Sequence, residues 1–188
     1  TPYYNKTSQA GLIAHFTAIA DSVNIPIILY NIPGRTGVNI AIETFVELAK
    51  HPNIVAVKEA GGNINYFAKI IEACGDSLDV YSGDDGMIVP VMSIGGKGVI
   101  SVLANIMPKE THNLCQLCLD NNFIEAGKEQ IRLLDLMNSL FIDVNPIPIK
   151  EALNLMGKNA GPCRMPLVPL SEKARNTLKA SMEKLHLI

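Results

Sequence analysis

The sequence lacks the features that mark membrane, secreted or nucleic-acid-binding proteins. No apolar run approaches the roughly 18 residues that a membrane-spanning helix requires. The formal net charge is −2 and the basic residues form no stripe, so nucleic acids and anionic membranes are poor candidate partners. No charged and apolar leader of the secretory type is visible, and four cysteines among 188 residues indicate no disulfide framework. These absences favour a cytoplasmic location.

Motifs for metals and nucleotides are also missing. Cys115 and Cys118 form a single C-x-x-C within an apolar helical pattern, which favours packed thiols over a zinc site. The glycines of residues 95–98 have neither the spacing nor the following Ser or Thr of a phosphate loop. Asp84 and Asp85 are interpreted as caps for the next helix rather than as Mg²⁺ ligands. These three patterns therefore do not indicate a zinc site, a phosphate loop or a magnesium site.

The composition is that of an α/β protein with a sizeable core, with 48% hydrophobic and 18% charged residues. One unit repeats along the chain: a short β-branched run, a polar or glycine-rich loop, and a helical period. The runs are apolar without alternation, which is typical of parallel strands covered on both faces. The predicted strands are residues 25–30, 54–58, 78–82 and 98–102, and mostly helices follow from residue 105.

Four strand–helix units make half of a TIM (β/α)₈ barrel, because a closed barrel takes about 250 residues. A doubly wound open sheet is the alternative, and the barrel is favoured because the reactive groups converge at the strand ends. We therefore expect residues 1–121 to form the C-terminal half of a barrel, from the end of strand 4 to helix 8. Residues 122–188 are expected to form a small helical appendage.

Three side chains at these strand ends carry the chemistry. Lys58 follows an apolar strand, where desolvation lowers the pKa of the amine and leaves it free to form a Schiff base; its alternative is to extend into solvent. Tyr30 ends the preceding strand and is a candidate proton relay, or a half-buried ring. Arg35 lies in the loop 31–37, where it suits a carboxylate ligand or a surface ion pair.

Six segments resemble the dihydrodipicolinate synthase / N-acetylneuraminate lyase superfamily. The likeness runs in the family's order along the whole chain. Lys-Glu-Ala at residues 58–60 and Pro-Gly-Arg-Thr-Gly at residues 33–37 resemble the synthase branch, since the lyase branch has an aromatic residue after its lysine and lacks this loop. The six segments are residues 1–5, 29–37, 57–60, 82–85, 98–102 and 145–150.

The resemblance implies a role for each residue. Lys58 would form an imine with pyruvate, and Tyr30 would relay protons beside it. Tyr4 matches a second relay tyrosine that the family contributes across a tight dimer interface, with Tyr3 stacking at that interface. Arg35 would bind the carboxylate of the aldehyde substrate, L-aspartate 4-semialdehyde. The reaction is the class I aldolase-type condensation that opens diaminopimelate and lysine synthesis.

The resemblance also implies a pocket and an assembly. Gly83 and Ile100 would line the pocket, chiefly through backbone atoms. No metal or nucleotide is required, because the pyruvate imine supplies the electron sink. The family is a homo-oligomer, a dimer of tight dimers.

One departure from the family pattern limits the expectation. The family's Gly-Thr-Thr-Gly-Glu segment, with the relay threonine and the pyruvate-carboxylate site, is absent, and the chain opens at Thr1. Residues 1–188 alone are therefore expected to be inactive or weak. A related aldolase for sugar acids or neuraminate is an alternative, against which Arg35 and Glu59 argue. A non-catalytic half-barrel that serves in regulation or assembly is another.

Overall fold

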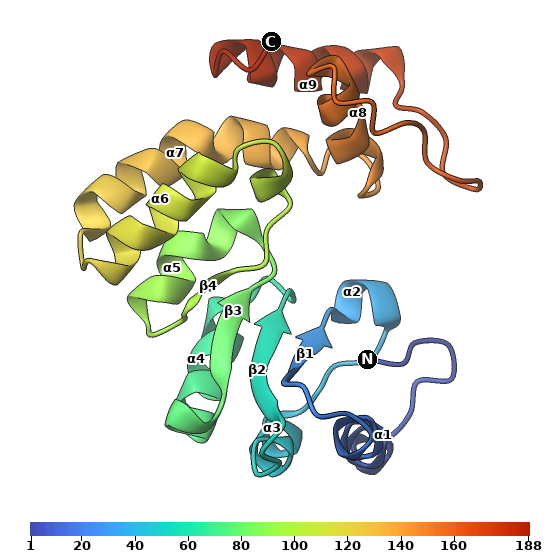
Figure 1. Ribbon diagram of the computed structural model, residues 1–188, viewed down its shortest axis with the longest axis vertical. Helices are drawn as coiled ribbons and strands as arrows, with labels where there is room; N and C mark the ends of the chain where they lie inside the picture. The colour runs from blue at the N-terminus through green and yellow to red at the C-terminus, as the bar shows by residue number, and fades with distance from the viewer. The chain divides into compact units, whose positions relative to one another are not determined.

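The computed structural model describes residues 1–188, and its contacts divide them into two compact units, Thr1–Ile100 and Ser101–Ile188. The first unit alternates strands with helices (Figure 1), and its elements are α1 (Gln9–Asp21), β1 (Ile27–Asn31), α2 (Pro33–Thr36), α3 (Ile42–Leu48), β2 (Ile54–Glu59), α4 (Ile64–Cys74), η1 (Gly75–Ser77), β3 (Asp79–Ser82), η2 (Asp85–Met87), α5 (Ile88–Ser93) and β4 (Gly98–Val99). The second unit is helical, and its elements are η3 (Leu103–Asn105), α6 (Pro108–Leu119), α7 (Phe123–Ser139), α8 (Ile147–Leu155) and α9 (Glu172–Lys184).

The four strands form one parallel sheet in the order β1-β2-β3-β4. At least one helix joins each pair of consecutive strands, as parallel pairing requires. Every strand predicted from an apolar run is present, and the spatial order of the strands follows their order in the sequence. The predicted α/β class with a parallel sheet is therefore confirmed.

Two strand boundaries differ from the prediction for local reasons. β1 begins at Ile27 rather than at residue 25, because Pro26 has no N–H to donate to a neighbouring strand. β4 contains only Gly98–Val99. Its predicted continuation ends early because the Ser101 side chain accepts a hydrogen bond from Ala104 N at 2.9 Å and starts a turn.

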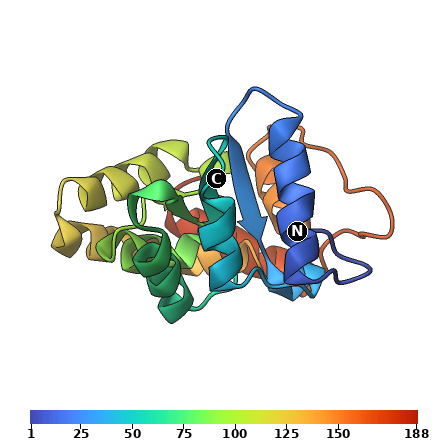
Figure 2. The same cartoon turned by 90° about the horizontal axis from the view of Figure 1, so that it is seen from below.

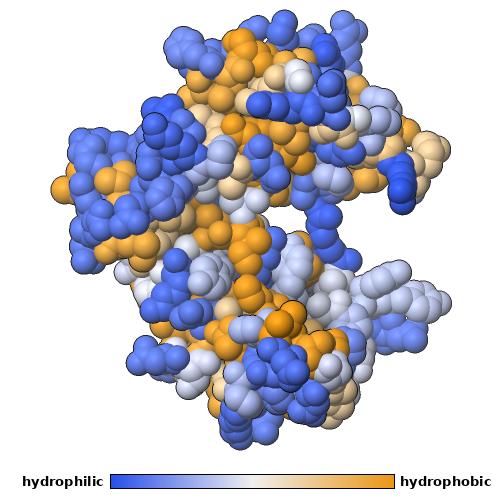
Figure 3. Space-filling view, viewed as in Figure 1, coloured by the Kyte–Doolittle hydropathy of each residue, from blue (hydrophilic) through white to orange (hydrophobic).

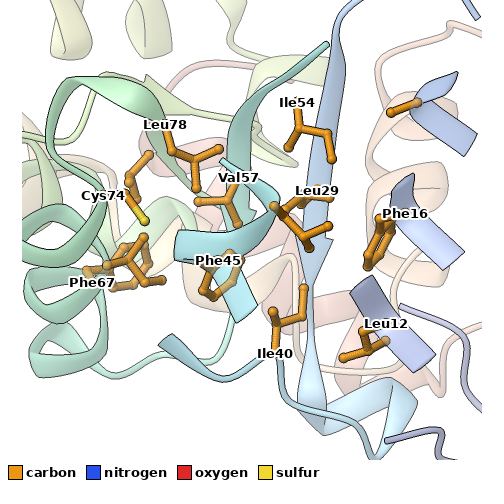
Figure 4. Packing of buried hydrophobic residues seen from close by; sticks show 14 of the residues in the cluster. Leu12, Phe16, Leu29, Ile40, Phe45, Ile54, Val57, Phe67, Cys74 and Leu78 are labelled. Atoms are coloured by element: carbon orange, nitrogen blue, oxygen red, sulfur yellow. The ribbon is translucent and has the colours of Figure 1, made fainter. Parts of the chain in front are cut away.

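The core of the first unit lies between one face of the sheet and helices α1, α3 and α4. Leu29 of β1 and Val57 of β2 are fully buried, as are Phe45 of α3 and Phe67 of α4. Figure 4 shows these side chains together with Phe16, which reaches them from α1, and Figure 2 shows α1 alongside β1. Each fully buried side chain of this size contributes about 1.5–3 kcal/mol, so this layer holds the strand ends in place.

The opposite face of the sheet is less covered. Tyr30, Lys58 and Tyr81 are partners in register across β1, β2 and β3, so their side chains point to the same side. Ile28, two residues before Tyr30 on that side, is 49% exposed. Figure 3 shows hydrophobic surface over the strands. Tyr30 and Lys58, two of the three side chains singled out for chemistry, therefore lie on the open face of the sheet.

Two helix ends in the first unit follow the general capping preferences of serine and glycine. The Ser8 side chain caps α1 by accepting a hydrogen bond from Gly11 N. Gly75 ends α4 at a positive φ of 52°, a conformation that glycine adopts without a steric penalty.

The second unit is built from helix pairs. α6 packs against α7, and α9 packs against both α7 and α8. The buried hydroxyl oxygens of Ser139 on α7 and Ser181 on α9 lie 2.7 Å apart and form a hydrogen bond. The prediction that helices predominate from residue 105 onward is confirmed. None of the helices combines the length and the apolar character that crossing a membrane demands.

Candidate active site

Tyr30 and Lys58 meet at the carboxyl ends of two neighbouring strands. They are directly paired in the register of β1 and β2. The Lys58 Nζ lies 4.4 Å from the centre of the Tyr30 ring, within the range of a cation–π contact. Strand pairing thus brings together the two residues that the sequence analysis placed at separate strand ends.

The Lys58 amine lies in a partly desolvated setting with charges of both signs. Burial lowers the pKa of the Lys58 ammonium below that of a free lysine, since a charged group is disfavoured away from water. The Asp85 carboxylate raises the pKa, and the Arg35 guanidinium lowers it. The predicted depression of the lysine pKa is therefore present in direction, and it enlarges the fraction of nucleophilic free amine.

The Tyr30 phenol is held in its protonated form. Burial raises its pKa above that of free tyrosine, and Arg35 opposes this shift. A phenol that keeps its proton at neutral pH donates a hydrogen bond and returns a proton to a leaving group. Tyr30 is therefore suited to proton transfer beside the Lys58 amine.

Arg35 lies in a short, tightly built segment. Its helix α2 begins with Pro33, whose fixed φ suits the first helical turn, and ends at Gly37 with a left-handed φ of 68°. Arg35 influences the pKa of both Tyr30 and Lys58, so its charge is felt at the reactive pair. Arg35, the residue predicted to bind a carboxylate, is therefore close enough to act electrostatically on Lys58, the predicted nucleophile.

Gly83 lies against the Lys58 side chain. A Cβ atom at residue 83 would stand 3.0 Å from Lys58 Cε and 2.6 Å from Ala60 Cβ. The Gly83 N–H donates to the Glu59 carbonyl at 2.7 Å. Glycine at residue 83 therefore leaves the space that the aliphatic part of the Lys58 side chain occupies, and any larger residue would crowd it.

Ile100 follows β4 on the open face of the sheet. Its N–H donates to the Ser82 carbonyl at 2.8 Å, so the backbone continues beside β3 after the strand ends. Gly98, two residues earlier, is in register with Tyr81, which is in register with Lys58. Ile100 therefore lies at the same strand-end edge as Lys58.

The two aspartates after β3 have different roles. Asp84 acts as a cap, as predicted, and its side chain accepts a hydrogen bond from Gly86 N at 2.8 Å. Asp85 is 2% exposed and acts electrostatically on Lys58. The sequence analysis missed this second role. The available signal was the position of Asp85 just beyond a strand end, at the edge of the sheet that carries Lys58.

Tyr3 and Tyr4 are more exposed than the residues of this half-buried cluster. They are 69% and 83% exposed, in a turn before α1 that is closed by a hydrogen bond from Lys6 N to the Tyr3 carbonyl. Their predicted place at a subunit interface stays a prediction. No group of three or more His, Cys, Asp or Glu side chains is arranged to hold a metal ion.

The charges around Lys58 lead to a measurable pH effect. Asp85→Asn removes the carboxylate that stabilises the Lys58 ammonium, so we expect the pKa of Lys58 to fall and its amine to react at lower pH. The check is the pH profile of amine acylation at Lys58, followed by peptide mass mapping. The exposed Lys50 in the same sample serves as the reference for reagent activity. A profile that stays in place, or moves to higher pH, contradicts the electrostatic contact.

Comparison with known proteins gives consistent matches. The model of the dihydrodipicolinate synthetase family matches residues 1–185. The 4-hydroxy-tetrahydrodipicolinate synthase 1 of Clostridium acetobutylicum is 55% identical over 183 residues, which cover 97% of this chain and 62% of that protein. The chain thus spans less than two thirds of the length of this relative.

Solved structures of the same family also match this chain. The dihydrodipicolinate synthase from Aquifex aeolicus matches with a TM-score of 0.97 at 43% identity, over 99% of this chain and 64% of that chain. A chloride-inhibited dihydrodipicolinate synthase from Acinetobacter baumannii, complexed with pyruvate, matches with a TM-score of 0.97 at 42% identity, over 100% of this chain and 65% of that chain.

Proposed function

Because this chain belongs to the dihydrodipicolinate synthetase family, we propose that the protein is a lyase that condenses pyruvate with L-aspartate 4-semialdehyde in diaminopimelate and lysine synthesis. The observation that carries the proposal is the half-buried Lys58 amine, 4.4 Å from the Tyr30 ring, with a lowered pKa. The pyruvate in the Acinetobacter baumannii structure supports the choice of the first substrate.

Lys58 and Tyr30 divide the first chemical steps between them. The Lys58 amine attacks the ketone carbon of pyruvate, and the resulting carbinolamine loses water to give an imine. Tyr30 supplies the proton that the departing hydroxyl needs. The imine then serves as the electron sink for an enamine, so the reaction needs no separate cofactor.

The second substrate engages the loop beside this pair. The enamine carbon adds to the aldehyde of L-aspartate 4-semialdehyde, whose carboxylate the Arg35 guanidinium binds. The amine of that substrate displaces Lys58 as the product cyclises. Gly83 and Ile100 line the pocket through their backbones, and Tyr4 of a second copy continues the proton relay.

The proposed architecture is that of a barrel enzyme. Residues 1–121 form the C-terminal half of a (β/α)₈ barrel and residues 122–188 form a helical appendage; the compact units themselves divide at Ile100 and Ser101. The open face of the sheet supports this reading, because a barrel interior needs further strands to cover it. We propose a cytoplasmic dimer of tight dimers, and the exposed Tyr3 and Tyr4 suit its tight interface.

The alternatives have less support. A pyruvate aldolase for sugar acids or neuraminate would not require the loop that holds Arg35, and the relative from Clostridium acetobutylicum is named a synthase. A non-catalytic half-barrel would not require the pairing of Tyr30 with Lys58.

The test is to trap the imine. The full-length gene product is incubated with pyruvate, reduced with borohydride and mapped by peptide mass spectrometry. We expect one reduced pyruvyl group, on the peptide that carries Lys58, and none on the peptide that carries the exposed Lys50. The absence of an adduct at Lys58 would refute the Schiff-base mechanism.

A further inference from the structure

A buried polar network lies on the other side of the sheet from Lys58. Asn31 and Glu59 are the last residues of β1 and β2, and they are partners in register. They are 0% and 1% exposed. The mechanism proposed above uses neither of them, although burying an amide and a carboxyl group is unfavourable unless hydrogen bonds compensate.

The Asn31 side chain closes the loop that carries Arg35. Its Nδ2 donates to Glu59 Oε2 at 2.6 Å and to Asn39 Oδ1 at 2.8 Å, and its Oδ1 accepts from Ile40 N at 3.1 Å. Asn39 and Ile40 lie at the far end of the segment 31–40 that carries Arg35, called the Arg35 loop. The chain therefore leaves β1 at Asn31, passes through Arg35, and returns to the same side chain.

Glu59 determines which way the Asn31 amide points. Its Oε1 accepts from Gly61 N at 2.5 Å, which leaves Oε2 for the Asn31 amide. If that amide were turned over, its oxygen would face the carboxylate, and Ile40 N would face an NH₂ group. Burial raises the pKa of Glu59, while hydrogen bonds from Asn31, Gly61 and the backbone of Ala60 oppose this shift.

The same network reaches the strand that carries the nucleophile. Glu59 directly follows Lys58, and its carbonyl accepts from Gly83 N at 2.7 Å. Tyr66 of α4 also holds the far end of the loop, because its hydroxyl donates a hydrogen bond to the Ile40 carbonyl. The far end of the Arg35 loop is thus connected to the end of β2 through side chains, not only through the backbone.

We propose that Asn31 and Glu59 are positioning residues that hold the Arg35 loop at a fixed distance from Lys58, so that a substrate carboxylate bound by Arg35 presents its aldehyde to the enamine. This inference rests on the proposed function. A network that only stabilised the fold would affect both substrates alike. A positioning network affects the substrate that binds the loop, because small displacements of a bound group are costly in rate and affinity.

The experiment separates the two substrates in the full-length gene product. Asn31→Ala removes the loop closure, and Glu59→Gln places an NH₂ group against one of the two N–H donors, Asn31 Nδ2 or Gly61 N. We expect the KM for L-aspartate 4-semialdehyde to rise about tenfold or more in both variants. The rate of pyruvate trapping at Lys58 is expected to stay within about twofold of the parent, because Lys58 lies on the other face.

Asn53→Ala is the matched control. Asn53 also donates two hydrogen bonds from its amide, to the carbonyls of Ala20 at 3.1 Å and Val23 at 2.9 Å, but it does not contact the Arg35 loop. We expect this variant to lose stability without a change in either KM. Asn39→Ala is a milder second variant at the end of the loop, because Asn39 is exposed. The substitution removes only one of the hydrogen-bond partners of Asn31.

Each outcome decides something. An unchanged KM for the aldehyde in Asn39→Ala and in both buried variants, with normal pyruvate trapping, overturns the positioning role and leaves the proposed function intact. A rise in KM that Asn53→Ala reproduces also overturns it, because general destabilisation would then explain the effect. A parent protein that traps no pyruvate removes the proposed function itself, and the inference falls with it.

Discussion

Replacing Lys58 with alanine is expected to reduce kcat/KM for the condensation by at least about a thousandfold, because the variant has no amine with which to form the imine. The effect should be the largest of any single substitution in the chain. Steady-state kinetics on the full-length gene product measures it, together with borohydride trapping of pyruvate, which should fail completely.

Lys58→Arg separates the chemistry from the packing. Arginine keeps a long cationic side chain at the strand end, but its guanidinium does not lose its proton in proteins and forms no imine under these conditions. We expect Lys58→Arg to be as inactive as Lys58→Ala while its thermal stability stays closer to that of the parent. Lys50→Ala, at an exposed lysine paired with Glu47, should keep parental kinetics. Parental turnover in Lys58→Arg would exclude an imine on this residue.

The Gly83→Ala variant is expected to lose about a hundredfold in kcat/KM, since a displacement of the reacting amine by about 1 Å has a cost of this order. The added Cβ would stand 3.0 Å from Lys58 Cε, 2.6 Å from Ala60 Cβ and 3.2 Å from the Glu59 carbonyl oxygen. The flexible lysine stem can move away from its own contact, but the approach to Ala60 Cβ is relieved only if the backbone beside Lys58 shifts, and both movements displace the amine. Such overpacking also destabilises a fold by about 1–3 kcal/mol.

Gly127→Ala is the control for this substitution. Gly127 lies within α7, and a Cβ added there meets nothing within 4 Å. Alanine should therefore stabilise the helix, by up to about 1 kcal/mol, and leave the kinetics unchanged. Both variants add one methyl group, and only the methyl group at residue 83 meets crowded neighbours. A Gly83→Ala enzyme with the parental rate would show that the Lys58 stem does not depend on the space beside it.

Local patterns accounted for the elements of the fold. The apolar runs located all four strands. These signals succeed because they depend on neighbours one to four residues away. The boundaries of β1 and β4 were less accurate, since they depend on which N–H groups find a partner in another strand.

The candidate site divides in the same way. Lys58, Tyr30 and Arg35 were identified as chemically suited side chains, and the family resemblance implied a role for each of them. Asp85 was taken for a cap, because its charge on Lys58 arises from a fold that places the end of β3 beside the end of β2. The role of Tyr4 stays a prediction, since it concerns a second copy of the chain.

By itself, the sequence determined the succession of parallel strands and helices and singled out Lys58 as the candidate nucleophile, because alternation, capping and strand-end position are properties of short segments. Only the tertiary structure decided that Tyr30 lies against Lys58, that Gly83 leaves room for the lysine stem, and that Asn31 reaches both Glu59 and Ile40. The physical reason is that strand register and buried hydrogen bonds join residues far apart in the chain, and their geometry is selected by the packing of the whole unit rather than by any local pattern.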